Sequence, residues 1–189
     1  MDSRTLLRRA SDFYDRHLAA VTSEQWSTPS ICDGWSVKDL ADHVLGGNRF
    51  AVGMLAGLDT PTAFSAALAD GFDDDPVISY RASMQAQLAA FEAPGALDVV
   101  VHHPAGDIGA REFLGFRLGD LLLHAWDLAQ STGRECTLDE ELVPVVWEAY
   151  RPILGAANDR GVFGTGASGD VSSEAPLSLR LLDLTGRRP

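Results

Sequence analysis

Three ionisable side chains follow one line along the otherwise apolar segment 113–131. At about 100° per residue, Asp120, His124 and Asp127 fall within a narrow stripe that also includes Ser131. The remaining faces are rich in leucine and aromatic residues, which indicates a buried helix. Because burying a lone carboxylate costs several kcal/mol, we expect these groups to be paired, to bind a metal ion or to face a cavity.

The spacing of Asp120 and His124 fits metal binding. Residues at i and i+4 share one helix face with Cβ atoms about 6 Å apart, so one helix can offer two ligands to one ion. Asp127 is placed to accept from the second imidazole nitrogen of His124 and to fix its tautomer. Two alternatives stay open: a buried ion-pair network of Asp120, His124 and Arg117, or a line that is the solvated face of the helix.

His43 is the candidate for a third ligand. It lies on a helix that should begin after Ser36, because Ser36 and Asp39 have the spacing of a capping box. A single histidine on such a helix is more often a residue of the core or its boundary than a ligand, and that alternative also stays open.

The elements that must position these residues are mostly helices. Apolar periodicity and capping signals predict four or five long helices joined by short loops, which favours an all-α, up-down four-helix bundle. The expected helices span residues 4–21, 36–55, 76–93, 110–131 and 139–159, the last kinked or broken near Pro152. Residues 97–103 suggest a short extended segment, and 57–75 have a mixed pattern. We expect residues 1–160 to form the bundle and 161–189 a Gly/Ser-rich loop and tail packed on the same domain.

Composition excludes several classes of protein. The 189 residues carry 15 basic and 27 acidic side chains, a net charge of −12 that repels nucleic acid and anionic membrane surfaces. Cys32 and Cys136 lack CxxC spacing, and the chain has no apolar run of membrane-spanning length. Because the first residues contain no apolar h-region, we expect no signal peptide. We therefore expect a reduced cytoplasmic protein with a small-molecule substrate or thiol as its partner; a homodimer is compatible with the sequence.

Three segments resemble one known family. Residues 26–49 include a Cys-Asp-Gly-Trp-Ser-Val-Lys-Asp-Leu run followed by Asp-His-Val-Leu-Gly-Gly, and residues 120–129 read Asp-Leu-Leu-Leu-His-Ala-Trp-Asp-Leu-Ala. Together with the ending at 177–189, these resemble the DinB-like metal-binding proteins of actinobacteria, which are related to the N-terminal domain of mycothiol-dependent maleylpyruvate isomerase.

The resemblance implies a DinB-like four-helix bundle with one divalent metal, usually zinc or nickel. Its ligands carry over to His43, His124 and Asp120, where the isomerase branch has a glutamate and this chain has one methylene less. The isomerase also has a further C-terminal domain for which this chain has no room, so maleylpyruvate isomerisation itself is not expected.

Three functions are compatible with these residues. The first is a thiol-dependent transferase or isomerase, in which mycothiol bound at the metal attacks a small electrophile. There Arg117 and Arg49 would steer a carboxylate of the substrate or cofactor, unless they are surface or ion-pair residues. The second is a non-catalytic metal-binding or regulatory module, and the third is a bundle that binds no metal.

Overall fold

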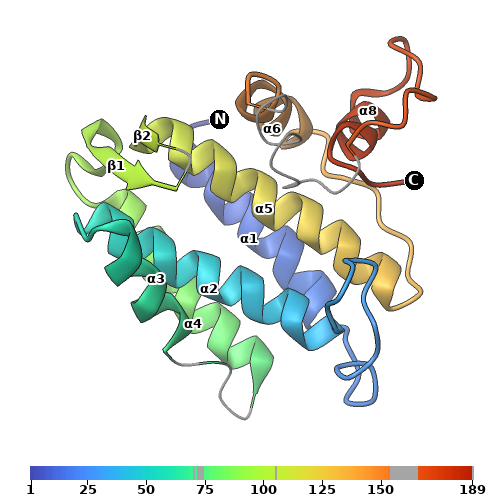
Figure 1. Cartoon of the computed structure of the whole chain (residues 1–189), viewed down its shortest axis with the longest axis horizontal. Helices are drawn as coiled ribbons and strands as arrows, with labels where there is room; N and C mark the ends of the chain where they lie inside the picture. Colours follow the sequence, from blue (N-terminus) through green and yellow to red (C-terminus); the bar gives the residue numbers. More distant parts are fainter. Residues whose placement is uncertain (70, 72–74, 105, 154–165, 189) are drawn as a thin grey trace. The chain divides into compact units, whose positions relative to one another are not determined.

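The contacts within the chain divide it into two units, Met1–Thr137 and Leu138–Pro189 (Figure 1). They are seen in a computed structural model, which describes every residue except 70, 72–74, 105, 154–165 and 189. The division predicted at residue 160 falls within 154–165 and so lies outside the described residues. The packing of the C-terminal tail on the bundle stays a prediction.

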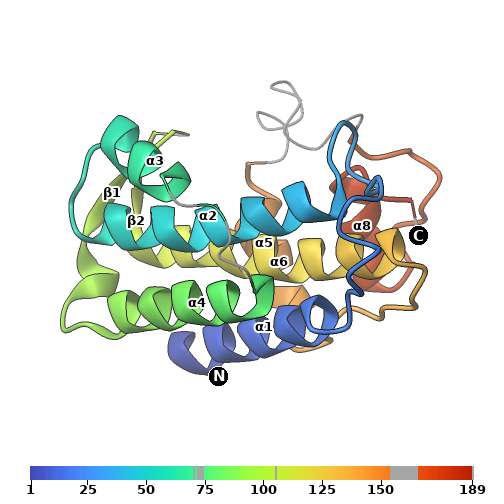
Figure 2. The same cartoon turned by 90° about the horizontal axis from the view of Figure 1, so that it is seen from below.

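Four helices of the first unit form the predicted bundle. They are α1 (Ser3–Leu18), α2 (Val37–Leu55), α4 (Pro76–Glu92) and α5 (Ala110–Ser131). Helices α1 and α2 each pack against both α4 and α5, as the two views in Figure 1 and Figure 2 show. The core includes Leu7, Leu40, Met84 and Leu121, one nearly fully buried side chain from each helix. The prediction of an all-α four-helix bundle is confirmed, and α2 and α5 are neighbours in it.

Local capping fixes where the helices begin. Ser36 Oγ accepts from the Asp39 N–H at 3.1 Å, and the Asp39 carboxylate accepts from the Ser36 N–H at 2.9 Å. This is the predicted capping box, and it sets the start of the helix that carries His43. At the start of α4 the cap is a side-chain acceptor, since the Asp75 carboxylate accepts from the N–H groups of Val77 and Ile78.

We expect Ser36→Ala to lower the free energy of unfolding by about 1 kcal/mol, because the first turn of α2 loses its side-chain acceptor. Urea denaturation followed by circular dichroism measures the loss. Ser65→Ala, at an exposed position within helix α3 (Thr60–Leu68), is the control and should cost nothing. Equal stability of the two variants would contradict the role given to the cap.

Two elements of the first unit were not predicted, a helix within residues 57–75 and the second strand of a hairpin that includes the predicted extended segment. Helix α3 occupies part of the mixed region 57–75 and is capped by Asp59, which accepts from the Thr62 N–H. The extended segment is part of a hairpin, in which β1 (Val100–His103) pairs antiparallel with β2 (Gly106–Gly109). Both were hard to predict because α3 is short and because β2 is half glycine, a residue that disfavours strands. The first helix also ends at Leu18, three residues earlier than expected.

The second unit contains two short helices that pack together, α6 (Val143–Tyr150) and α8 (Leu177–Leu184). The predicted helix over 139–159 is shorter at both ends where the structure describes it. It ends at Tyr150, shortly before Pro152, which has no N–H to donate to the carbonyl oxygen four residues earlier and so cannot continue the helix. No helix among the described residues is long and apolar enough to cross a membrane.

Candidate metal centre

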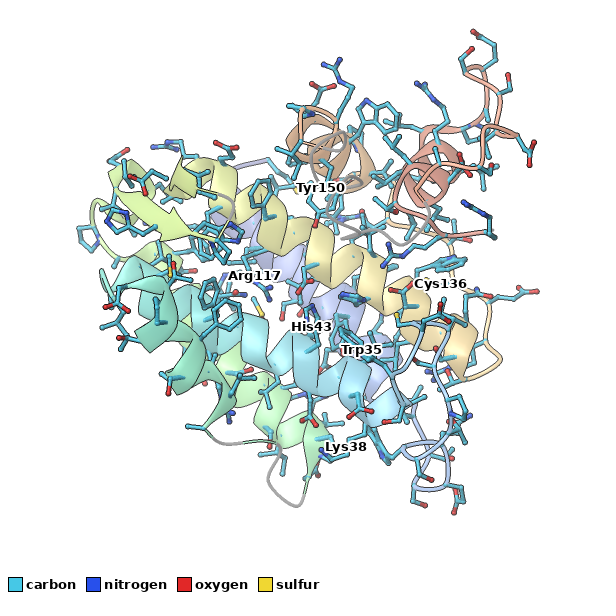
Figure 3. The ribbon with its side chains drawn as sticks, in the orientation of Figure 1. Trp35, Lys38, His43, Arg117, Cys136 and Tyr150 are labelled. Atoms are coloured by element: carbon cyan, nitrogen blue, oxygen red, sulfur yellow. The ribbon has the colours of Figure 1, made fainter. Side chains whose placement is uncertain are left out.

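His43 on α2 meets Asp120 and His124 on α5. The Asp120 Oδ1 atom lies 3.2 Å from His43 Nε2 and 3.3 Å from His124 Nε2. One possible ligand atom of each residue lies within 4.8 Å of the other two. Figure 3 shows His43 between the ribbons of the two helices, with Arg117 and Trp35 to either side of it. The structure thus brings together the three residues predicted as ligands.

These distances suit a single small ion. Two neighbouring ligands of a tetrahedral ion with bonds of about 2.0–2.1 Å are about 3.4 Å apart. Two imidazoles and one carboxylate are also the donor types of catalytic zinc sites, which leave one position open. The side chain of His43 is 42% exposed, against 17% for Asp120 and 14% for His124, so the cluster opens to solvent at His43. The cluster therefore fits a divalent cation, and without one the same atoms form the ion-pair network of the alternative interpretation.

The buried Arg117 guanidinium orients Asp120. Its Nη1 donates to Asp120 Oδ2 at 2.7 Å, which leaves Oδ1 directed at the two imidazoles. Burial alone would raise the pKa of the Asp120 carboxyl, but the charge of Arg117, followed by His43 and His124, outweighs burial and holds the pKa well below its ordinary value. Asp120 is therefore ionised and held in place before any cation binds.

Besides Asp120 on its own helix, Arg117 contacts one residue of α4 and one of α2. Its Nε donates to Gln87 at 2.8 Å and its Nη2 donates to Asn48 at 2.9 Å, and both amide side chains are fully buried. Asn48 in turn donates to Ser83 Oγ. A Cβ atom at Gly47 would lie only 2.9 Å from the Arg117 Cζ, so the glycine leaves the space that the guanidinium fills. Because every guanidinium nitrogen donates to a protein group, this geometry favours the ion-pair interpretation of Arg117 over a role in steering a substrate.

Asp127 supports His124 from the other edge of its ring. Its Oδ2 atom lies 2.8 Å from His124 Nδ1, and the residue is 1% exposed. Burial lowers the pKa of His124, but hydrogen bonds with Asp120, Asp127 and Cys32 outweigh burial and hold the pKa well above its ordinary value. The contact has the geometry predicted for Asp127, in which Nδ1–H donates to the carboxylate and Nε2 faces the cluster. Asp120, which faces both imidazoles, is the better placed of the two carboxylates for a ligand.

Two residues of the loop before α2 complete the surroundings. The Trp35 ring lies 4.9 Å from the His43 ring and 6.3 Å from the His124 ring, so it borders both imidazoles. Cys32 Sγ lies 3.7 Å from Asp127 Oδ2. The sequence pattern did not single out either residue for this site, because about 90 residues separate them from His124 and Asp127.

Arg49 is not part of this cluster. It lies six residues after His43 and therefore about 120° away around α2. Its Nη2 atom donates to the carbonyl oxygen of Gly71 at 3.4 Å. The other histidines also lie elsewhere: His17 beside Cys136, His102 beside Asp107, and His103 against the Phe113 ring.

The chain matches the family model of the mycothiol maleylpyruvate isomerase N-terminal domain over residues 7–129. That range includes His43, Asp120 and His124. The uncharacterised proteins Rv0738 and MT0763, from two strains of Mycobacterium tuberculosis, are each 34% identical over 157 residues. Each alignment covers 82% of this chain and 81% of the relative.

Solved structures of the mycothiol-dependent maleylpyruvate isomerase have a similar fold. The TM-score is 0.56 at 18% identity for one of them and 0.57 at 21% identity for a histidine-to-alanine variant. Each match covers 76% of this chain and 65% of the isomerase chain, so this chain spans just under two thirds of that enzyme's length. Because the family match covers more than half of the chain, the protein belongs to the mycothiol maleylpyruvate isomerase N-terminal domain family.

Proposed function

We propose that His43, Asp120 and His124 bind one divalent cation, zinc or nickel, and that the protein is a mycothiol-dependent transferase or isomerase acting on a small electrophile. The observation that carries the metal site is the 3.2 and 3.3 Å separation of Asp120 Oδ1 from the two imidazole nitrogens. The thiol is supported by membership of a family named for a mycothiol-dependent enzyme.

Each residue around the proposed cation site would have a distinct role. A bound divalent cation would supply Lewis acidity, which lowers the pKa of a thiol placed against it. Arg117 keeps Asp120 ionised and fixes which of its oxygens faces the cluster. Asp127 holds the Nδ1 proton of His124, so that Nε2 is free to act as a ligand. Trp35 borders both imidazoles, while the exposed edge of His43 leaves a way in for the thiol.

The metal site is tested by elemental analysis of protein purified without an affinity tag. The wild type is expected to contain one equivalent of zinc or nickel, and both His43→Ala and His124→Ala should lose it, because each removes one of three protein ligands. His102→Ala is the control, since His102 pairs with Asp107 on the exposed hairpin. Metal content unchanged in both site variants would eliminate this site.

The thiol is tested separately, by calorimetry of mycothiol with zinc-loaded and chelator-treated wild-type protein. Binding is expected only to the loaded protein. Thiol adducts of added electrophiles, detected by mass spectrometry, would then identify the reaction class. Mycothiol binding without any turnover would favour the non-catalytic metal-binding module, and no binding would overturn the proposed thiol dependence.

A further inference from the structure

Cys32 is held by a well-defined turn. The Trp35 N–H donates to the Cys32 carbonyl oxygen at 3.0 Å, closing a four-residue turn with Gly34 at its third position. Gly34 has a φ of +79°, which glycine adopts without strain and which a type II turn requires at this position. Ser30 Oγ accepts from the Cys32 N–H at 3.1 Å. The backbone that carries the thiol is therefore fixed by local hydrogen bonds.

The same turn is attached to the C-terminal part of α5. The Ile31 N–H donates to Ser131 Oγ at 3.0 Å, and Ser131 Oγ donates to the Asp127 carbonyl oxygen at 2.6 Å. These two bonds connect a loop residue to a helix turn 96 to 100 residues away in sequence. As a result, Cys32 Sγ lies 3.7 Å from the Asp127 carboxylate.

We propose that Cys32, His124 and Asp127 form a second metal-binding set, selective for thiophilic divalent cations. One possible ligand atom from each residue lies within 4.8 Å of the other two. Asp127 is almost fully buried, whereas Cys32 and His124 are partly exposed, which leaves the set accessible to an ion. A thiolate, an imidazole and a carboxylate suit a soft cation better than the nitrogen and oxygen donors of His43, Asp120 and His124.

The other cysteine shows what distinguishes Cys32. Cys136 also has a histidine beside it, with its Sγ 3.5 Å from His17 Nε2. It belongs to neither of the two three-residue clusters found among the described residues, and burial raises the pKa of its thiol to about 11. A cysteine next to a histidine is thus not enough, and the nearby carboxylate of Asp127 sets Cys32 apart.

The second set shares His124 with the first but needs neither His43 nor Asp120, so it does not rest on the proposed function. A neutral imidazole has one lone pair for a metal. For a cation bound among Cys32, His124 and Asp127, the hydrogen bond between Nδ1 and Asp127 has to be given up. The two sets should therefore compete, and a thiophilic cation should remove the ring orientation on which the first set depends.

Cadmium is the probe for this proposal. Titrating the metal-free wild type with Cd²⁺ is expected to produce the ultraviolet charge-transfer absorption of a thiolate–cadmium bond, saturating near one equivalent. Cys32→Ser should abolish this absorption, while Cys136→Ser should keep it. His43→Ala should also keep it, which separates this set from the proposed zinc or nickel site.

Cadmium-113 NMR of the wild type adds a readout that needs no variant to fold, because the resonance position reports whether sulfur is among the ligands. Far-ultraviolet circular dichroism establishes that each variant keeps its helices. Absorption that persists in Cys32→Ser, or that disappears in Cys136→Ser or His43→Ala, would overturn the proposal. A resonance typical of nitrogen and oxygen ligands alone would overturn it as well.

Discussion

Replacing Arg117 with methionine is expected to lower the free energy of unfolding of the metal-free protein by about 3–5 kcal/mol, the usual cost of breaking a buried ion pair from one side. Arg117 and Asp120 are 2.7 Å apart, with side chains only 8% and 17% exposed. Methionine keeps most of the apolar stem but removes the charge and the donors, so one side-chain oxygen each of Asp120, Asn48 and Gln87 loses its Arg117 donor. Urea denaturation in the presence of a chelator measures the loss.

A second arginine in the same bundle provides a matched control. Arg81 on α4 donates twice to Asp15 on α1, at 2.8 Å each, and is 59% exposed. Because solvent screens such a pair, Arg81→Met should cost less than about 1 kcal/mol. If Arg117→Met were no more destabilising than Arg81→Met, the ionised state of Asp120 would not depend on Arg117.

The effect of Arg117→Met should also depend on pH. In the wild type the pKa of Asp120 is held well below its ordinary value of 3.8, so its contribution to stability is present above that pH and is lost as the pH falls through the folded-state pKa. In Arg117→Met the folded-state pKa of Asp120 is higher than in the wild type. As the pH falls, Asp120 is therefore protonated first in the variant, which removes the buried charge that destabilises it. The difference in unfolding free energy should therefore shrink as the pH falls towards about 4.

The sequence could predict the part of the site that lies on one helix. Asp120, His124 and Asp127 are three or four residues apart, and helical geometry alone places them on one line. The start of α2 could also be predicted, because the Ser36–Asp39 capping box is local. The pairing of α2 with α5, and with it the contact between His43 and Asp120, is tertiary, and only the resemblance to a family pointed to it.

The partners of Arg117 show where sequence reasoning reaches its limit. Asn48 continues the buried stripe of Val44 on α2, and Gln87 lies between Met84 and Phe91 on the buried stripe of α4. A polar amide on an apolar stripe is a signal that some buried group needs a partner. This signal does not identify the partner, because the periodicity of one helix gives no information on which side chain of a neighbouring helix packs against it.

The positions of Arg117, Arg49 and the loop that carries Cys32 could not be predicted from the sequence for the same reason. Arg117 and Arg49 look alike in sequence, yet one is buried beneath Asp120 and the other donates to a loop carbonyl on another side of α2. Cys32 lies near Asp127 only because the bundle folds its loop back over α5. Such contacts depend on the three-dimensional arrangement of segments, so they cannot be predicted from residue spacing or from composition.

Asp127→Asn is expected to weaken zinc binding by about 10–100-fold, the usual effect of removing the partner of a metal-binding histidine. The carboxylate of Asp127 can only accept, so it requires the proton of His124 on Nδ1 and leaves Nε2 free for the metal. An asparagine offers an N–H₂ donor as well, which permits the opposite tautomer, with the proton on Nε2. Competition with a chromogenic chelator measures the zinc affinity.

The hairpin supplies the matched control for this variant. Asp107 lies 2.7 Å from His102 Nδ1, the same type of pair, but both side chains are more than 60% exposed and neither is in the cluster. Asp107→Asn should leave zinc affinity unchanged. Equal affinity of Asp127→Asn and the wild type, with the helical content of both intact, would mean that His124 keeps its orientation without Asp127. In that case the packing of the His124 ring against Trp35 and His43 would have to determine which nitrogen faces the metal.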